Sequence, residues 1–306
     1  MRVIEVAAFG GPEALQVVER PDPVAAPGQV LVRVRAANVN PTDLSVRDGS
    51  VVRRNPKVTP PVVPGWDLAG EVAAVGDGVT GLTPGQRVVA MLHWPTHTGA
   101  VGAYSELVAL NAGLVIPTPD GVDDPTAATI PLNALTADQA LAIIDPAPGT
   151  TLLVTGASGA VGAFAAQFGV QRGLRVIAQA GRDDEDFVWS LGVEDVLPRD
   201  ADLTAIDEVD NVLDAVPIGP VAATRMAAGG TAVFTRGIQG EAPEGQRYEV
   251  VLCKDDPVAL RRVVADVGDG LIATRVAQVL PIEDAPRAHE LTETGGNHGK
   301  IVLAFS

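Results

Sequence analysis

Short runs in which apolar and polar residues alternate dominate the first third of the chain. In residues 30–36 (VLVRVRA) apolar side chains alternate with arginine, as in a half-buried strand of an antiparallel sheet. Residues 1–9, 70–75 and 86–91 predict further short strands, and a stretch rich in glycine, residues 76–85, separates the last two. Many short strands with dense turn signals indicate a small β-barrel-like domain.

From about residue 118 the pattern changes to apolar strands that alternate with helices. The apolar run at residues 151–155 (TLLVT) predicts a buried strand, and the alanine-rich residues 160–172 predict the helix that follows it. The alternation continues with a predicted strand at residues 174–179 and a predicted helix at residues 184–191. Two further strands are predicted at residues 211–216 and 231–235. This rhythm is typical of a parallel sheet with helices on both faces, and right-handed crossovers make such a sheet doubly wound.

The end of the chain contains a strand, a helix over residues 283–293 and a closing strand over residues 300–305. We expect this segment to return to the first domain and complete it. The predicted fold class is therefore α/β with two domains. Residues 1–117 and 268–306 form the β-rich domain, and residues 118–267 form the doubly wound domain.

Composition and charge narrow the range of partners. The length of 306 residues suits two domains, and a hydrophobic content of 46% is enough for a sizeable core. The formal net charge of −16 disfavours nucleic acids and anionic membranes, because their phosphates would be repelled. No apolar run reaches the roughly 18 residues that a membrane helix needs, and the first residues lack the pattern of a signal peptide. We therefore expect a cytoplasmic protein.

Three glycines link the predicted strand at residues 151–155 to the helix that follows it. A helix that begins directly after a strand presents free amide N–H groups and the positive end of its dipole to an anion. Gly156 would permit the tight turn, Gly159 would let a diphosphate approach the backbone, and Gly162 would let the helix pack closely. A glycine-rich turn without a ligand is the alternative. The predicted dinucleotide site consists of Thr155, Gly156, Ala157, Ser158, Gly159, Ala160, Val161 and Gly162.

The end of the second strand of this unit indicates which dinucleotide binds. An acidic residue there favours NAD, because it binds the ribose 2′-OH, whereas a basic residue favours the 2′-phosphate of NADP. Arg182 is the first charged residue after the strand, so NADPH is the predicted cofactor. The acidic residues 183–186 oppose this choice unless they form the first turn of the next helix, with Asp183 as its N-cap. The alternative for Arg182 is an ordinary exposed surface residue.

Several blocks of the sequence, in order along the chain, carry a family resemblance. They are residues 36–49 (AANVNPTDLSVRDG), 60–76 (PPVVPGWDLAGEVAAVG), 84–90 (PGQRVVA), 132–141 (LNALTADQAL), the glycine loop, 184–192 (DEDFVWSLG) and 298–305 (HGKIVLAF). Together they resemble the quinone oxidoreductase branch of the medium-chain dehydrogenase/reductase superfamily. The resemblance implies a GroES-like catalytic domain built from both chain ends, a Rossmann domain in the middle and a coenzyme in the cleft between them. It also implies a homodimer, commonly formed through the coenzyme domains.

The residues that bind zinc in zinc-dependent relatives are replaced in this chain. Such sites need thiolate and imidazole ligands. Where the relatives carry the first Cys this chain has Asn40 or Pro41, and their Gly-His-Glu segment corresponds to Gly65-Trp66-Asp67. The single cysteine, Cys253, has no nearby partner, and the histidines of residues 93–97 (HWPTH) would form only an improvised pair. We therefore expect no metal, and alcohol dehydrogenation is disfavoured without a Lewis acid.

The resemblance also assigns roles to individual residues. Asn40 would lie near the nicotinamide and offer an amide donor where negative charge develops on a substrate oxygen; its alternative is a turn cap before Pro41. Thr136, at the start of a predicted helix, resembles a residue that approaches the nicotinamide, or is simply a helix-start Thr. Lys300 would reach the cofactor, or simply begin the last strand. Tryptophans are often core residues, but the predicted substrate pocket consists of Trp66, His93 and Trp94.

The predicted reaction is hydride transfer from NADPH to a quinone or a similar enone without zinc. A quinone accepts a hydride readily, and solvent can protonate its oxygens, so this reaction requires no strong acid from the protein. An enoyl-thioester reductase or a tailoring enone reductase is the first alternative. It would benefit from a placed acid, for which Asp138 and His93 are the candidates. The second alternative is a non-catalytic NADPH-binding protein whose substrate pocket is filled.

Overall fold

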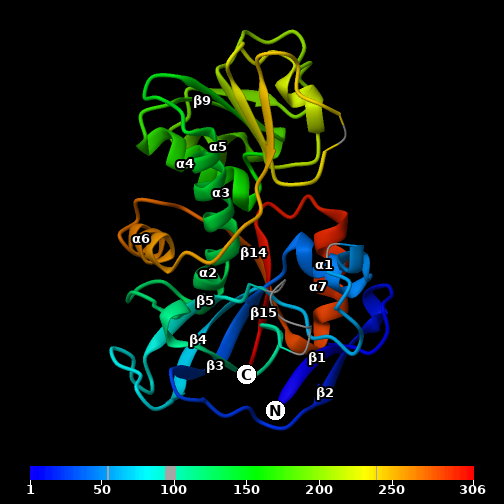
Figure 1. Cartoon of the computed structure of the whole chain (residues 1–306), viewed down its shortest axis with the longest axis vertical. Coiled ribbons are helices and arrows are strands. Elements are labelled where there is room, and N and C mark those ends of the chain that lie inside the picture. Colours follow the sequence, from blue (N-terminus) through cyan, green and yellow to red (C-terminus); the bar gives the residue numbers. More distant parts are fainter. Residues whose placement is uncertain (54, 94–100, 239) are drawn as a thin grey trace. The chain divides into compact units, whose positions relative to one another are not determined.

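The computed structural model describes residues 1–53, 55–93, 101–238 and 240–306, and it divides the chain into two compact units (Figure 1). The first unit consists of Met1–Leu132, Asp255–Leu271 and Arg275–Ser306. The second unit consists of Asn133–Lys254 and Ile272–Thr274. Residues 118–132 and 255–267, which we expected in the doubly wound domain, thus belong to the first unit.

The first unit is built on two sheets whose strand pairs are antiparallel, except that β14 and β15 pair in parallel. β1 (Arg2–Val6) pairs with β2 (Leu15–Glu19) in a small two-stranded sheet. The larger sheet has the order β14-β15-β3-β4-β5-β7, with β6 paired to β3. Its strands are β3 (Gln29–Asn38), β4 (Asp67–Val75), β5 (Arg87–Met91), β6 (Leu107–Asn111), β7 (Ile116–Pro117), β14 (Val276–Pro281) and β15 (Lys300–Ala304). The C-terminal β15 therefore lies beside β3, as we expected from the closing strand of the sequence.

Among its described residues, the first unit also contains four short α-helices: α1 (Pro41–Arg47), α2 (Asp124–Ala128), α6 (Pro257–Gly268) and α7 (Ala285–Thr294). α2 contacts β3 and β4, and α6 contacts β7, which explains why these two helices belong to the first unit. α1 and α7 lie against each other (Figure 1). Arg47 at the end of α1 is buried and forms an ion pair with Glu293 of α7, so the two helices are tied by charge as well as by packing.

The second unit contains a six-stranded sheet in which every pair of neighbouring strands is parallel. The order is β10-β9-β8-β11-β12-β13. The chain moves outward from β8 to β10, then returns to β11 and moves outward on the other side, which confirms the predicted doubly wound sheet. The strands are β8 (Thr151–Thr155), β9 (Arg175–Ala180), β10 (Asp195–Pro198), β11 (Asn211–Asp214), β12 (Thr231–Phe234) and β13 (Arg247–Val250).

The helices of this unit cover a strongly apolar sheet. Leu152, Leu153 and Val154 of β8 are completely buried, as in a strand with packing on both faces. α4 (Ala160–Gln171) packs against β8 and β9, and α5 (Glu185–Ser190) packs against β9 and β10. α3 (Pro131–Ile144) begins at the last residues of the first unit and continues into the second.

Two local expectations were wrong. Asp183 is not the N-cap of the helix after β9, because a 3₁₀ turn, Arg182–Asp184, precedes α5 and starts after Gly181. Thr136 does not begin a helix, because α3 already starts at Pro131, a residue whose fixed φ suits the first helical position. Thr136 therefore lies in the second turn of α3, where it is 9% exposed.

Candidate active site and nucleotide-binding loop

The glycine loop of the second unit connects the carboxyl end of β8 to the first turn of α4. Gly156 has a φ of +63°, in the left-handed region, and a Cβ there would lie 2.4 Å from Cγ1 of Val216. A Cβ on Gly162 would lie 2.3 Å from the carbonyl oxygen of Gly156. Gly156 and Gly162 therefore have the predicted conformational reasons to be glycine: one makes the turn, and the other allows close packing of helix and loop.

The loop leaves backbone donors available at the start of α4. The amides of Ala157 and Gly159 already donate to the carbonyl oxygens of Gln179 (2.9 Å) and Gly156 (2.9 Å). The first turn of α4 contributes the backbone amides of Ala160, Val161 and Gly162. By contrast, within the described residues these three N–H groups donate to no acceptor.

The surface of the loop is open beside Gly159. A Cβ on Gly159 would meet only the carbonyl oxygen of Gly156, at 3.3 Å. Three free donors at the positive end of a helix, beside an exposed glycine without a side chain, fit the diphosphate of a dinucleotide.

Thr155 and Asp214 form a buried contact beneath this loop. The Thr155 hydroxyl donates to Oδ1 of Asp214 (2.5 Å), and the amide of Gly219 donates to Oδ2 (2.8 Å). Burial raises the pKa of Asp214, against the lowering influence of these donors. The hydrogen bond of Thr155 thus links the end of β8 to the end of β11 and stabilises the position of the glycine loop. No local pattern predicted this pair, because the two residues are 59 positions apart.

A second arginine accompanies Arg182 at the end of β9. Arg182 is exposed, and Arg199 follows directly on β10, the parallel neighbour of β9. A Cβ built on Gly181 would lie 3.2 Å from Nη2 of Arg199, so this guanidinium lies against the end of β9. Two arginines therefore follow neighbouring strands at the carboxyl end of the sheet. Sequence reasoning missed Arg199 because it depends on the pairing of β9 with β10.

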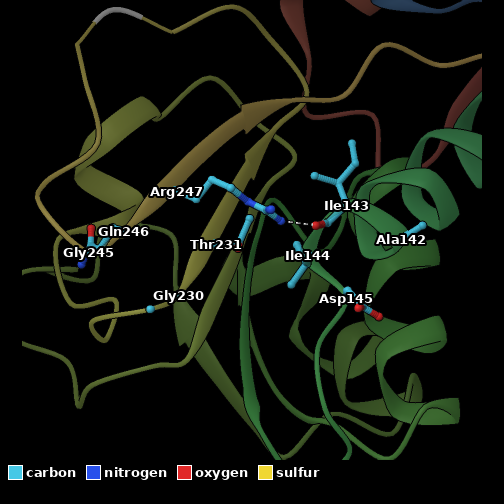
Figure 2. A pocket seen from close by; sticks show the side chains of 10 residues that line it. Ala142, Ile143, Ile144, Asp145, Gly230, Thr231, Gly245, Gln246 and Arg247 are labelled. Atoms are coloured by element: carbon cyan, nitrogen blue, oxygen red, sulfur yellow. Dashed lines mark hydrogen bonds between the residues drawn. The ribbon is translucent and has the colours of Figure 1, made fainter.

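A cavity of about 560 Å³ lies in the second unit, and Figure 2 shows the residues that line it. It is at the amino ends of β12 and β13, whereas the glycine loop follows the carboxyl end of β8. The cavity lies between the end of α3, at residues 142–145, and the turns at residues 229–231 and 245–247, which lead into β12 and β13. Arg247 crosses it and donates from Nη2 to the carbonyl oxygen of Ile143 (2.6 Å). This contact caps the negative end of α3, so the arginine has a structural role there.

The first unit contains a buried polar cluster, which we call the Asn40 cluster: Asn38, Asn40, Asp43, Asp67 and Lys300. The side-chain amide of Asn40 donates to Oδ2 of Asp67 (2.7 Å), and its oxygen accepts from Nδ2 of Asn38 (3.0 Å) and Nζ of Lys300 (2.9 Å). Asn40 is 1% exposed. The predicted amide donor thus lies inside the unit and already has an acceptor.

Two carboxylates fix the segments on which this cluster is built. Asp43 accepts from the backbone amides of Asn40 (2.8 Å) and Gly65 (3.0 Å), which ties the start of α1 to the segment before β4. Asp67 accepts from the backbone amide of Leu132 (2.8 Å). Burial raises the pKa of Asp43 to about 7 and that of Asp67 to about 6.

Tyr104 and His289 extend the polar interior beyond Asp43. Both are completely buried, and the Tyr104 hydroxyl is hydrogen-bonded to Nε2 of His289 (3.2 Å). Burial lowers the pKa of His289 to about 3, so this imidazole is neutral at physiological pH. The pair joins the strand-rich part of the unit to α7.

The predicted substrate pocket is described only in part. Trp66 is 7% exposed, and its ring lies 5.9 Å from that of His93, at an angle of 58°. The indole N–H of Trp66 is buried and has no acceptor within the described ranges. Trp94 and His97 lie outside the described residues. The pocket therefore stays a prediction.

Metal ligands and membrane helices can be assessed for the described part of the chain. There, no three or more His, Cys, Asp and Glu side chains are grouped so that they could hold a metal ion. The resemblance places Asn40 or Pro41, together with Trp66, where zinc-dependent relatives carry ligands, and the Lys300 ammonium lies 2.9 Å from the amide oxygen of Asn40. Among the same residues, no helix combines the length and apolar character that a membrane span requires.

Two protein families match the sequence. The family described as "Alcohol dehydrogenase GroES-like domain" matches residues 26–120, and that described as "Zinc-binding dehydrogenase" matches residues 184–303. A quinone oxidoreductase homologue from spinach chloroplasts is 33% identical over 216 residues, which are 67% of this chain and 64% of the relative. Rat quinone oxidoreductase is 35% identical over 187 residues, 60% of this chain and 54% of the relative. The matched part thus spans less than two thirds of these curated relatives.

Solved structures match over the whole chain. The quinone oxidoreductase of Coxiella burnetii has a TM-score of 0.86 at 26% identity and covers 100% of this chain and 99% of its own. An NAD-dependent alcohol dehydrogenase has a TM-score of 0.88 at 30% identity, with 100% of both chains covered. These matches confirm the GroES-like domain and the Rossmann domain. The chain therefore belongs to the medium-chain dehydrogenase/reductase superfamily, and the relatives that it resembles include quinone oxidoreductases.

Proposed function

We propose that this protein is an NADPH-dependent oxidoreductase that reduces a quinone or a similar enone without zinc. The observation that carries this proposal is the glycine loop, with three free amide donors at the start of α4. The coenzyme supplies a hydride when bound, and the amides of Ala160, Val161 and Gly162 would hold its diphosphate. Ser158 and Gly159 would line the same anion, while Thr155, Gly156 and Ala157 shape the turn.

The preference for NADPH rests on the charges at the end of β9. Arg182 and Arg199 both lie at this edge of the sheet, where a dinucleotide bound to the loop would place its adenosine ribose. Two guanidinium groups suit a 2′-phosphate, because each can form charge-assisted hydrogen bonds with it. Two of the neighbouring acids have another role. Glu185 and Asp186 lie in the first turn of α5, where negative charge stabilises the helix.

The choice of a quinone or enone rests on the residues of the first unit and on the relatives. Proteins named quinone oxidoreductase are among the matches in both sequence and structure. Trp66 and His93 provide ring surfaces against which a flat substrate could stack, and Asn40 and Thr136 would lie near the reacting groups. The side chains at the zinc-ligand positions, Asn40 and Trp66, favour chemistry without a Lewis acid.

The proposal is tested by mixing the protein with NADPH or NADH and following the loss of the reduced nicotinamide absorbance. Separate reactions contain a benzoquinone, cyclohexenone or crotonyl-CoA. We expect turnover with the benzoquinone, with NADPH used better than NADH. Binding of neither coenzyme in a calorimeter would refute the proposal.

An enoyl-thioester or tailoring enone reductase is the second candidate, and one specific observation favours it. Such an enzyme needs an acid, and the Lys300 ammonium lies at the Asn40 cluster. Turnover with crotonyl-CoA alone in the same assay would support this candidate. Binding of NADPH without any turnover would instead support a non-catalytic NADPH-binding protein. We also propose that the protein is a homodimer.

A further inference from the structure

The members of the Asn40 cluster differ in how they meet the surface of the first unit. Asn38, Asp43 and Asp67 have no exposed surface, and Asn40 is 1% exposed. Lys300, at the start of β15, is only half-buried. A molecule that approaches the cluster therefore meets the Lys300 side chain before it meets any other member.

The ammonium group of Lys300 still has donors to offer. It donates to Oδ1 of Asn40 (2.9 Å), and within the described residues this is its single hydrogen bond. An ammonium group has three N–H donors, so two remain available. The charged groups that act on it are Asp67 of β4 and Asp43 of α1. Both act on it through charge alone and not through a hydrogen bond, so the carboxylates attract the cation without contacting it directly.

We propose that Lys300 is the acid that protonates the substrate oxygen during the reduction, and that Asn40, Asp67 and Asp43 position its ammonium group. This inference rests on the proposed function, because it requires a substrate that gains a hydride. It applies to quinones and enones alike, since in both the negative charge develops on a carbonyl oxygen. Lys300 would be the catalytic residue, and Asn40 would be a positioning residue that accepts one of its hydrogen bonds.

The proton transfer balances without a further reagent. After the substrate has gained the hydride, an electron pair resides on its former carbonyl oxygen. One N–H bond of Lys300 breaks, its electron pair stays on the nitrogen, and the proton forms an O–H bond with the substrate. The neutral amine then regains a proton from water. The products are a hydroquinone or an enol, and the enol converts to the ketone in solvent.

The chemistry of the group agrees with this role. Burial lowers the pKa of Lys300 from 10.5 to about 8, while Asp67 and Asp43 act in the opposite direction. An acid works best when its pKa is close to the working pH, because it is then both protonated and able to release the proton. The group is charged below about pH 8 and neutral above it.

The two acids that the sequence suggested are less suitable. Asp138 lies in α3 and already forms an ion pair with Arg172 (2.8 Å), so its carboxyl group has a structural partner. His93 packs against the ring of Trp66, and its interactions give no reason to single it out as a donor. Lys300 instead combines charge, partial exposure and free N–H groups in one side chain.

The first experiment measures the ammonium group directly, without any turnover. The chain contains only three lysines, Lys57, Lys254 and Lys300, so selective ¹³C labelling of lysine gives three Cε signals. Single Lys→Met variants assign them. We expect the Lys300 signal to titrate near pH 8, while the signals of the exposed Lys57 and Lys254 serve as internal references. Asp67→Asn should lower the midpoint of Lys300 further, because a negative neighbour is removed; Asp43→Asn serves if that variant fails to fold.

The probe for ligand contact is 4-nitrophenol, whose phenolate resembles the oxygen anion, added together with NADP⁺. We expect the Lys300 signal to shift and the other two to stay. A Lys300 signal that titrates with the other two, or that does not respond to the phenolate, would overturn the inference.

The second experiment compares Lys300→Met and Lys300→Arg, with Lys57→Met as the matched control. We expect Lys300→Met to lose about 100-fold or more in kcat with cyclohexenone, the usual effect of removing a general acid, while the NADPH Kd changes less than about threefold. In the wild type, kcat should fall as the pH rises through about 8. Lys300→Arg should lose this fall, because a guanidinium stays charged.

The outcomes separate this inference from the proposed function. Normal kcat in Lys300→Met refutes the acid but leaves the reductase intact. A large rise in the NADPH Kd with unchanged kcat would assign Lys300 to coenzyme binding and overturn the acid. Absence of turnover and of coenzyme binding in the wild type would refute the proposed function itself.

Discussion

The side chains that would recognise the coenzyme ribose lie at the ends of two neighbouring strands. Arg182 follows β9, and Arg199 follows β10 with its guanidinium against Gly181. Arg182 could be identified from the sequence, because it is the first charged residue after a recognisable strand. Arg199 could not, because its place depends on the parallel register that sets Pro198 beside Ala180.

Replacing either arginine should weaken NADPH more than NADH. We expect Arg182→Ala and Arg199→Ala each to raise the NADPH Kd about tenfold or more, since a hydrogen bond to a charged group contributes about 1.5–3 kcal/mol. NADH lacks the 2′-phosphate, so its Kd should change less than about twofold. Calorimetric titration of both coenzymes measures this. Arg53→Ala is the control, because Arg53 is also exposed but lies in the first unit. Equal losses for both coenzymes would contradict the preference for NADPH.

At the scale of elements, the strand–loop–helix segment of β8 and α4 is the best-determined part of the second unit. Its apolar strand, its glycines and its alanine-rich helix are contiguous, so the local sequence specifies both the fold and the free amides. The structure ends α4 at Gln171, one residue before the predicted end, and shifts β9 by one residue. Such small differences do not move the loop, because Gly156 and Gly162 fix its geometry.

Two alanine substitutions should separate the structural glycine from the ligand-facing one. In Gly162→Ala the new Cβ would lie 2.3 Å from a backbone oxygen, so we expect a loss of about 1–3 kcal/mol in the free energy of unfolding. In Gly159→Ala the nearest atom is 3.3 Å away, so stability should change little while the NADPH Kd rises about tenfold or more.

Urea unfolding and calorimetry provide the two measurements. Gly237→Ala is the matched control, because its Cβ would meet no atom within 4 Å and Gly237 lies outside the loop. Tighter or unchanged NADPH binding in Gly159→Ala would argue against a diphosphate at this loop.

At the scale of the whole molecule, the net charge of −16 affects the electrostatic interactions of the protein with other molecules, including a second copy of the chain. Two copies repel each other over a distance that salt shortens to about 10 Å at 0.1 M. β13 pairs only with β12 among the described strands, so one edge of the parallel sheet has unpaired backbone groups. Such an edge is a natural place for a second copy to pair.

Sedimentation should therefore detect a dimer whose stability increases with salt. We expect twice the chain mass of 31.4 kDa, and a dimer Kd that falls severalfold as NaCl is raised from about 20 to about 300 mM, because screening weakens the repulsion. Sodium sulfate at the same ionic strength serves as a control for the anion. A single-chain mass at every salt and protein concentration would contradict the proposed homodimer.

The sequence by itself determined what depends on neighbours along the chain. The period of apolar residues indicated strands and helices, and the three glycines indicated the turn between β8 and α4, because these features arise from local backbone geometry. Only the tertiary structure decided what depends on distant pairs. Lys300 meets Asn40 across 260 positions, and Asp67 meets Leu132 across 65. Burial in that cluster sets the charge states of these groups, and no local pattern encodes which buried groups become neighbours.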